Sequence, residues 1–309
     1  MKEKILDLLS SNRSQVFSGE KLSQDLNVSR VTIWKHIKKL QELGYKIIST
    51  TKGYQLMEAP DALFAWEFQE RSSKIHYFSE VESTMITAKK LARNNCPDFT
   101  IVIAEKQTQG RGRLSRKWHA DPGGLYFTMV LRPDIPPALM SRISFSASLN
   151  LAKILRNLLN IDAMVKWPND ILVDEKKLSG MLCEMEVEDD MVKFLNIGIG
   201  INVNNDPTDF EPNATSIKKI LGKEVKRKDF LKAYLDAFEN DLRRGDISQV
   251  IPEWKKYTIT LGRRVKIVTS RDVSFGKAID VDDTGALILE QEDKSIKKIF
   301  YGDCFHQGD

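Results

Sequence analysis

The spacing of the hydrophobic residues changes twice along this chain, and it divides the 309 residues into three parts. In residues 1–60 apolar side chains recur every three or four positions, which predicts amphipathic helices. In residues 61–258 helical segments alternate with apolar runs of strand length, which predicts a mixed α/β domain. In residues 259–309 short strands are separated by turn residues, which predicts a small β-barrel. The expected fold class is therefore α+β, in three domains.

Composition argues against several kinds of protein. With 41% hydrophobic and 29% charged residues, the chain is expected to be globular. No run approaches the roughly 18 apolar residues of a membrane span, and the amino terminus lacks a signal-peptide pattern, so we expect a cytoplasmic protein without a membrane partner. Cys96, Cys183 and Cys304 form no CxxC pair, and only four histidines are present. We therefore expect neither a disulfide framework nor a structural metal.

The excess positive charge lies at the amino terminus. Residues 1–60 hold ten Lys and Arg against six Asp and Glu, and the resulting net charge of +4 equals that of the whole chain. The rest of the chain is balanced. Such a localised basic excess predicts an anionic partner for the first domain.

The first domain has the pattern of a helix-turn-helix. Two short helices are expected around residues 5–9 and 22–26, and Ser29 is a favourable N-cap for a third helix, residues 30–43, which ends at Gly44. In this arrangement the last helix enters the major groove of DNA. The residues expected on its exposed face are Arg30, Thr32, Lys35, His36 and Lys39.

The segment YKIISTTKGYQL follows, and it alternates apolar and polar residues around Lys52 and Gly53. This alternation predicts a hairpin that resembles the wing of a winged helix, with Lys52 near DNA. A small helical bundle with a solvated basic face is the alternative. The order of the elements and the localised charge favour DNA binding.

The stretch EKQTQGRGRLSRKWHADPGG, residues 105–124, carries Arg111, Arg113, Arg116 and Lys117 without an acid between Gly110 and His119. It is not a dinucleotide fingerprint, because Ser115 replaces the third glycine of GxGxxG and a strand follows instead of a helix. No P-loop motif is present either. Taken alone, the segment is as well explained by a solvated surface loop as by an anion site.

Three other stretches add polar groups to this loop. In VESTM, Ser83 and Thr84 stand at a helix start, where hydroxyl groups and free amides bind anions or small polar molecules. In VKWPNDILV, Lys166 lies in an apolar strand before a turn with Asn169 and Asp170. In NIGIGINV, small residues precede Asn202, so a planar ring can lie close to the backbone there.

Together these motifs resemble the biotin-protein ligases: ST, Q-x-x-GRGR-x-x-R-x-W, KWPND, K-x-SG and G-x-G-x-N occur in order. The amino-terminal domain is similar to that of the bifunctional biotin operon repressors. The resemblance implies a winged helix in residues 1–60, a catalytic domain like those of class II aminoacyl-tRNA synthetases and biotin-lipoate ligases in residues 61–258, and an SH3-like barrel in residues 259–309. It also implies the reaction. Biotin and MgATP form biotinyl-5'-AMP, and a lysine of a biotin carboxyl carrier domain then takes the biotin.

The reaction explains why cations are needed. The biotin carboxylate must attack the α-phosphorus of ATP, which is already surrounded by anionic oxygens, and cations neutralise the negative charge that accumulates there. The residues assigned to biotin are Ser83, Thr84, Gln107, Gly110, Arg111, Gly112, Arg113, Trp118 and Lys166. Those assigned to ATP and the adenylate are Arg113, Arg116, Trp118, Asn169 and Asn202. The residues expected to be catalytic are Lys166, Arg113 and Arg116, and Asp170 is a candidate Mg²⁺ ligand.

The expected partners are a carrier domain, operator DNA and, when the adenylate is bound, a second copy of the chain, with the adenylate as corepressor. Two alternatives stay open at this point. One is a lipoate or octanoate ligase with a DNA-binding domain, which shares the fold. The other is a repressor that senses biotin without catalysis.

Overall fold

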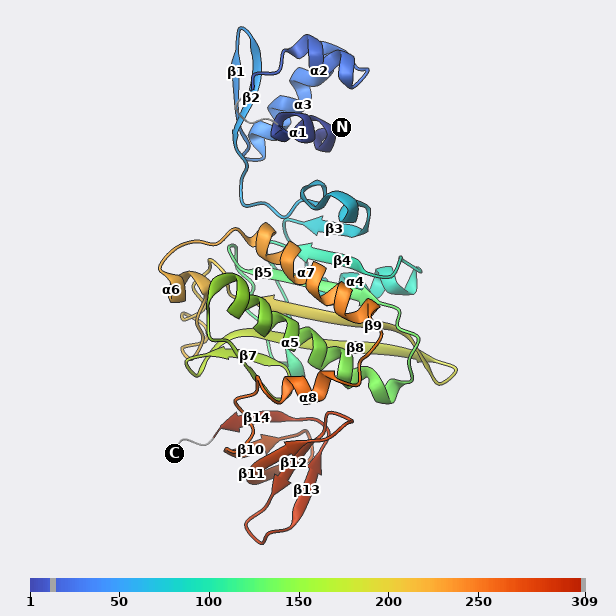
Figure 1. Ribbon diagram of the computed structural model, residues 1–309, viewed down its shortest axis with the longest axis vertical. Helices are drawn as coiled ribbons and strands as arrows, with labels where there is room; N and C mark the ends of the chain where they lie inside the picture. The colour runs from blue at the N-terminus through green and yellow to red at the C-terminus, as the bar shows by residue number, and fades with distance from the viewer. Residues whose placement is uncertain (12–14, 307–309) are drawn as a thin grey trace. The chain divides into compact units, whose positions relative to one another are not determined.

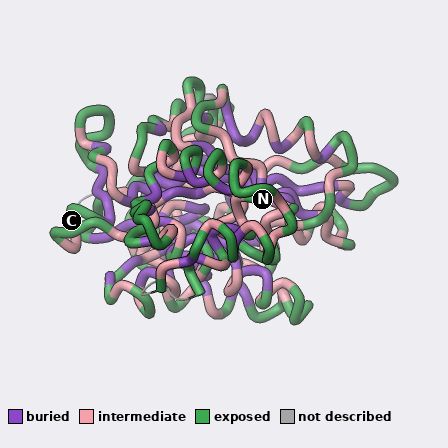
Figure 2. Tube along the Cα trace, turned by 90° about the horizontal axis from the view of Figure 1, so that it is seen from above, coloured by how far each residue is buried: buried purple, intermediate pink, exposed green. Residues whose placement is uncertain are grey.

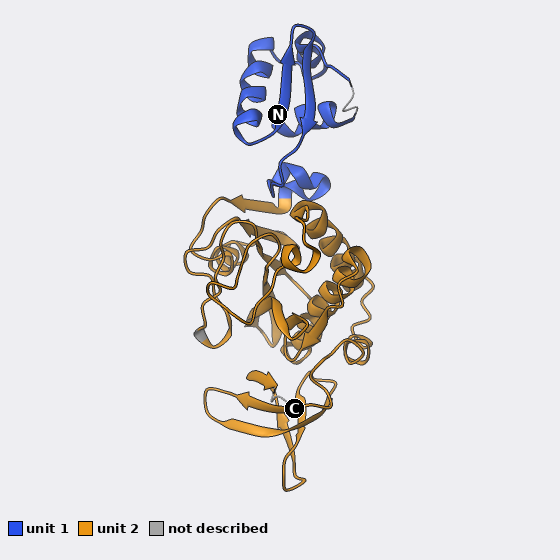
Figure 3. Cartoon of the chain, turned by 90° about the vertical axis from the view of Figure 1, so that its left-hand side faces the viewer, with its two compact units in different colours: residues 1–73 blue, residues 74–309 orange. Residues whose placement is uncertain are grey.

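The computed structural model describes residues 1–11 and 15–306, in two compact units, Met1–Ser73 and Lys74–Asp309 (Figure 3). The first unit extends to Ser73, because Phe64 and Trp66 pack against its core. The predicted ligase domain from residue 74 onward and the predicted barrel lie in the second unit, whereas residues 61–73 belong to the first. The domain boundaries at residues 60 and 258 stay predictions.

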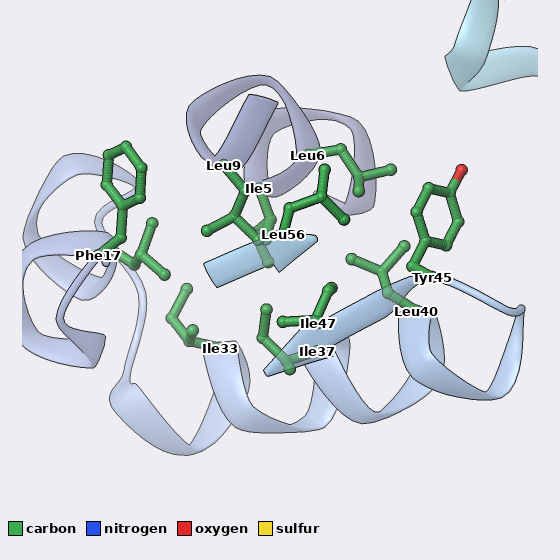
Figure 4. Packing of buried hydrophobic residues seen from close by; sticks show 11 residues of the cluster. Ile5, Leu6, Leu9, Phe17, Ile33, Ile37, Leu40, Tyr45, Ile47 and Leu56 are labelled. Carbon is green, nitrogen blue, oxygen red and sulfur yellow. The ribbon is translucent and has the colours of Figure 1, made fainter. Parts of the chain in front are cut away.

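The first unit contains three helices and a hairpin: α1 (Lys2–Ser11), α2 (Gly19–Asp25), α3 (Arg30–Glu42), β1 (Lys46–Thr50) and β2 (Gly53–Glu58). Ser18 and Ser29 cap α2 and α3, since each hydroxyl accepts a hydrogen bond from a backbone N–H three residues later. The apolar faces of the helices meet in one core (Figure 4), and Ile5, Ile33 and Leu40 are completely buried there.

The hairpin is tied to the segment before α2. Phe17 and Tyr54 exchange two backbone hydrogen bonds of 2.9 and 2.8 Å. Gly53 lies between them at a φ of 140°, and a Cβ atom there would collide with the Phe17 carbonyl. The β1–β2 hairpin is therefore held to the core of the first unit by these backbone hydrogen bonds.

A seven-stranded sheet forms the centre of the second unit, in the order β3-β4-β5-β9-β8-β7-β6. Only the β3–β4 pair is parallel among these neighbours. The strands are β3 (Ile75–Phe78), β4 (Thr100–Ala104), β5 (Leu125–Leu131), β6 (Met164–Lys166), β7 (Asp170–Val173), β8 (Lys176–Glu188) and β9 (Met191–Ile201). The sheet is mixed, as an α+β fold requires.

Helices cover both faces of this sheet. On one face α5 (Met140–Leu159) and α7 (Arg227–Arg243) lie against each other (Figure 1), and Phe127 of β5 meets Tyr234 of α7 in an edge contact. On the other face α4 (Thr84–Arg93) packs on β5 and β9, where Thr128 donates a hydrogen bond to Thr84. The other helical segments are α6 (Ile217–Leu221), α8 (Val250–Trp254), η1 (Ala65–Lys74), η2 (Arg113–Ser115) and η3 (Pro137–Leu139).

The carboxyl-terminal strands form a second, five-stranded antiparallel sheet in the order β13-β12-β11-β10-β14. They are β10 (Arg264–Val268), β11 (Val273–Val281), β12 (Leu287–Glu290), β13 (Ile296–Ile299) and β14 (Asp303–His306). Trp167 ties this sheet to the ligase domain, because its backbone N–H donates to Thr260 and its indole to the Gly285 carbonyl. In Figure 2 the buried segments run between exposed loops, as expected of cores enclosed by surface turns.

Most predicted elements are confirmed, and one difference bears on the site. Strand β14 was not predicted. No helix in the described part of the chain is long and apolar enough to cross a membrane.

Candidate active site and DNA-binding surface

A cavity of about 480 Å³ lies on the α4 side of the large sheet, over β8 and β9, and this size suits a small-molecule site. Its walls come from the start of α4, the loop 105–124, the turn between β6 and β7, the segment 207–214 and strand β14. The predicted site residues that line it are Ser83, Thr84, Gln107, Arg111, Gly112, Arg113, Arg116, Trp118, Lys166, Asn169, Asp170 and Asn202. Gly110 is buried behind the loop, where a side chain would collide with the Trp118 carbonyl.

Hydroxyl and amide groups form one end of the cavity. The Gln107 side-chain oxygen accepts hydrogen bonds from the backbone N–H and the hydroxyl of Thr84, at 2.8 and 3.1 Å. Ser83 occupies the N-cap position of α4, but its hydroxyl caps nothing. This hydroxyl is buried without a partner among the described residues, and such groups usually have one. This end is therefore suited to a ligand with both donors and acceptors.

The floor of the cavity is a pair of glycines on neighbouring strands, Gly180 and Gly200, over which the Trp118 indole lies. A Cβ atom on Gly200 would collide with the indole, and one on Gly180 would lie 3.1 Å from it. The sequence pattern indicated that a planar ring can lie on this backbone, and in this structure the ring is that of Trp118. Its indole N–H is buried without a partner among the described groups.

The four cations of the loop are held in different ways. The Arg113 guanidinium donates to Asn169 and to the Gly302 carbonyl, both at 3.1 Å. Burial lowers the pKa of Arg113, and Asp303 and Asp170 oppose this shift. Arg116 forms an ion pair of 2.5 Å with Asp303. Arg111 instead pairs with Glu184 on β8 at 3.1 Å, and Lys117 is exposed. Arg113 and Arg116 therefore meet the cavity beside strand β14.

Three lysines line the cavity, Lys117, Lys166 and Lys177, and only Lys166 was assigned a role from the sequence. Lys166 ends β6 and lies near β14; burial, together with the charges of Lys166 and Arg263, lowers the pKa of His306 to about 4. Lys177 of β8 forms an ion pair of 2.9 Å with Asp170, and its ammonium lies 5.6 Å from the centre of the Trp118 ring. The K-x-SG motif contained Lys177, so the signal was present in the sequence.

Both asparagines of the predicted site are buried. Asn169 accepts the hydrogen bond from Arg113 and donates one to the Met181 carbonyl. The Asn202 side-chain oxygen accepts from Asn205 at 3.0 Å. Their positions are fixed by neighbouring strands and by the segment after β9, so they form rigid polar points in the wall.

Strand β14 of the barrel is part of the cavity wall, which the sequence analysis did not foresee. Asp303, Cys304, Phe305 and His306 all line the cavity. The barrel therefore contributes a counter-charge for the loop through Asp303 and a backbone acceptor through Gly302.

The two ends of the cationic loop are held together by Arg227, at the start of α7. Its guanidinium donates to the Glu105 carboxylate at 2.6 and 3.3 Å and to the Gly124 carbonyl at 2.9 Å. Its side chain is only 7% exposed. Because Glu105 begins the loop and Gly124 ends it, this buried contact fixes the stem from which the cations project.

Helix α3 presents the surface expected to meet DNA. Arg30, Lys35 and Lys39 are exposed, as is Lys52 in the wing turn. Thr32 and His36 are only partly exposed, because both lie at the edge of the buried stripe. Burial and then the charges of the amino terminus, Lys39 and Lys2 lower the pKa of His36. His36 is therefore a weaker candidate for a charged contact than the lysines.

The exposed face of α3 also has an apolar part that the sequence analysis missed. Val31 is 62% exposed and Trp34 is 50% exposed, one helical turn apart, with exposed Lys38 a turn further on. The sequence contained the signal, because Val31, Trp34 and Lys38 recur at helical spacing outside the buried stripe of Ile33 and Ile37.

The fold and the site define a class of protein: a winged-helix domain on the same chain as an α+β domain with a cation-lined, small-molecule cavity. Three family models match: the HTH domain over residues 2–55, the biotin/lipoate A/B protein ligase family over 77–204, and the biotin protein ligase C terminal domain over 260–307.

Individual proteins match over almost the whole chain. The bifunctional ligase/repressor BirA of Bacillus subtilis is 35% identical over 318 aligned residues, which cover 98% of each chain, and that of Escherichia coli is 29% identical over 94% of this chain and 92% of its own. The structure of a biotin protein ligase from Aquifex aeolicus in complex with biotin and ATP matches with a TM-score of 0.64 and 30% identity, over 76% of this chain and 99% of that one. The chain belongs to the family of bifunctional ligase/repressors. The predicted fold class and family are confirmed.

Proposed function

We propose that this protein is an ATP-dependent biotin-protein ligase that also represses transcription in response to biotin. One observation carries the proposal: a cavity with a polar end at Ser83 and Gln107, a glycine floor, and several cations along its walls. The relatives named bifunctional ligase/repressor support both activities, and the Aquifex relative was solved with biotin and ATP.

The polar end of the cavity is proposed to bind the ureido ring of biotin, which offers a carbonyl acceptor and two N–H donors. The hydroxyl of Ser83, which has no partner among the residues that the structure describes, supports this assignment, together with the amide of Gln107. Thr84 holds Gln107 in place. Trp118, which lies on Gly180 and Gly200, is proposed to form a wall beside the bound ring, and the backbone from Gly110 to Gly112 is proposed to close around the ring.

In the first step, a biotin carboxylate oxygen attacks the α-phosphorus of ATP, and pyrophosphate leaves. Lys166, Arg113 and Arg116 are proposed to neutralise the charge that accumulates around phosphorus, and we add Lys177 because it lies beside the floor. Asn169 and Asn202 are proposed to hold the nucleotide. In the second step, the amine nitrogen of a carrier lysine attacks the acyl carbon, AMP leaves, and the amine proton passes to solvent.

Magnesium is proposed to enter with ATP. Among residues 1–11 and 15–306 there is no group of three His, Cys, Asp or Glu side chains that would hold a metal. Asp170 faces the cavity but is paired with Lys177. A single carboxylate fits Mg²⁺, which usually keeps its waters and binds substrate phosphates. Asp170 is thus at most one ligand of an ion held mainly by the triphosphate.

We further propose that the ligand bound in the cavity controls DNA binding by the winged helix. Lys35, Lys39 and Lys52 are proposed to bind DNA phosphates, and biotinyl-5'-AMP is proposed to act as corepressor by promoting a homodimer that presents two winged helices to two half-sites. We also propose a cytoplasmic location for the protein. A coupling of about 1 to 3 kcal/mol would tighten dimerisation roughly 5-fold to 150-fold.

The two alternatives are separated by one experiment. The protein is incubated with ATP, a biotin carboxyl carrier domain and either biotin or lipoate, and the mass of the carrier and the release of pyrophosphate are followed. We expect modification with biotin alone, and tighter operator binding when biotin and ATP are present without carrier. Modification by lipoate, or operator control without any turnover, would contradict the proposal.

A further inference from the structure

Helix α3 has a strip of exposed side chains that includes two large apolar ones. Residues three and four positions apart are neighbours on a helix surface, so four exposed residues form one continuous surface. We call it the α3 strip, and its members are Val31, Trp34, Lys35 and Lys38. Val31 and Trp34 are at least half exposed, and neither belongs to the core of the first unit. Neighbouring exposed apolar side chains often mark an interaction site, so these two need a partner.

The apolar pair lies at the beginning of α3. Ser29 caps this helix, because its hydroxyl accepts a hydrogen bond from the backbone N–H of Thr32 at 3.2 Å. The helix begins at Arg30, so Val31 and Trp34 lie in its first two turns. In helix-turn-helix proteins the N-terminal residues of the recognition helix contact base edges in the major groove. Val31 and Trp34 therefore occupy positions suited to contact with bases.

The surroundings of the pair are basic. Helix α3 has four exposed cations, Arg30, Lys35, Lys38 and Lys39, and its one acidic residue is Glu42, at the last position. A basic surface of this kind is complementary to the phosphates of a duplex. This charge favours DNA over an apolar protein surface as the partner of Val31 and Trp34.

The chemistry of these two side chains selects among the bases. The α3 strip contains no Asn, Gln, Ser or Thr, so Val31 and Trp34 are not flanked there by side chains that both donate and accept hydrogen bonds. The nearby hydroxyls of Ser29 and Thr32 are hydrogen-bonded to each other at 2.9 Å. Thymine is the base that presents an apolar group, its C5 methyl, in the major groove. An apolar side chain at the start of a recognition helix therefore matches thymine.

We infer that Val31 and Trp34 recognise thymines of the operator by contact with their C5 methyl groups, while the surrounding lysines bind phosphates. This inference rests on the proposed repressor function, and it adds which bases the start of α3 contacts in each half-site. The two residues are about 4.5 Å apart along the helix axis, which exceeds the rise of about 3.4 Å per base pair. Each side chain is therefore expected to contact its own base pair.

Replacing thymine by uracil tests the inference, because uracil lacks only the C5 methyl group. Duplexes of random sequence that the full chain retains with biotin and ATP are selected, and one of them is synthesised again with uracil at each thymine in turn. Dissociation constants are measured for the wild type, Val31→Ala and Trp34→Ala. Met57→Ala is the control, because Met57 lies on β2 and is 51% exposed, as accessible as Trp34 but outside α3. Thermal unfolding checks that each variant is folded.

We expect uracil at a contacted thymine to weaken binding by the wild type roughly fourfold, the effect of leaving one methyl group unburied. Val31→Ala should remove this difference at one thymine and Trp34→Ala at another, since the side chain that contacts the methyl group is gone. Met57→Ala should keep the wild-type ratio between thymine and uracil duplexes. The slope of log K against log salt should be the same for all four proteins, because no phosphate contact is removed.

The outcomes separate this inference from the proposed function. Uracil duplexes that bind as tightly as thymine duplexes would overturn the inference and leave the repressor function standing. Variants that weaken both kinds of duplex equally would also overturn it, as would variants that change dimerisation in sedimentation but not the thymine-to-uracil ratio. If the chain retains no duplex, the repressor function and the inference both fall. Thymine-dependent binding that does not respond to biotin would support the inference and contradict only the control by biotin.

Discussion

Lys177 offers the sharpest test of how the cavity handles charge. Its ammonium lies beside the Trp118 ring and is paired with Asp170 at 2.9 Å. A cation about 4 Å from a phosphate oxygen contributes about 4 kcal/mol at an effective dielectric constant of about 20. With 1.36 kcal/mol for each factor of ten, Lys177→Met should slow adenylation by up to about 10³-fold. The assay is pyrophosphate release in a single turnover at saturating biotin and ATP.

The Asp170 pair makes this prediction more specific. Lys177→Met leaves the Asp170 carboxylate facing the phosphates without its counter-charge, so part of the lost rate comes from repulsion. The double variant Lys177→Met with Asp170→Asn should therefore react faster than Lys177→Met alone, and a double-mutant cycle measures the difference. If Asp170 is instead a required metal ligand, the double variant will be the slower one.

Lys176 provides the matched control, because it is the neighbouring residue and its side chain is exposed. Lys176→Met should keep the wild-type rate. A Lys177→Met enzyme with near-normal pyrophosphate release would refute the assignment of Lys177 to the reacting phosphates.

Four further predictions concern other parts of the site. Lys166→Ala should reduce pyrophosphate release at saturating substrates by about 10²-fold to 10³-fold, and normal turnover would remove it from the catalytic set. Ser83→Ala should weaken biotin binding in calorimetry by about 1 kcal/mol, roughly fivefold, since one hydrogen bond is lost; an unchanged Kd would contradict the ureido assignment. Arg227→Met should raise the KM for ATP and biotin more than it lowers kcat, and Arg227→Lys should restore part of the loss; equal loss in both variants without a change in KM would refute a positioning role. Trp34→Ala should reduce discrimination between operator and random DNA at an unchanged slope of log K against log salt, whereas loss of a phosphate contact would reduce that slope by about 0.9.

Much of the fold followed from local patterns. Residues such as Ile33 and Leu40 repeat at helical spacing because they face one small core, so the winged helix was predictable. The end of α3 was predictable because Gly44 follows, with a φ of 93°. By contrast, β14 has only four residues, and only one of them, Cys304, is buried, so its sequence has no strong alternation.

The site was predictable in part because short motifs carry most of its polar groups. The motifs did not indicate which of these polar groups contact one another in the folded chain. Arg227 lies 122 residues from Glu105, and no local pattern indicates that their ion pair closes the stem of the loop. Asp303, in the predicted barrel domain, forms an ion pair with Arg116, in the predicted ligase domain. Such contacts depend on the packing of the sheet and the barrel, which the order of elements alone does not determine.

The proposed function depends on one reaction in the cavity, the formation of an acyl-adenylate from biotin and ATP. The most direct measurement is a single-turnover reaction with enzyme in excess over α-labelled ATP, quenched at successive times, with biotin, with lipoate and without an acid. We expect biotinyl-5'-AMP to appear, together with one equivalent of pyrophosphate, only when biotin is present. Label that stays in ATP with biotin, or an adenylate that forms equally well with lipoate, would contradict it.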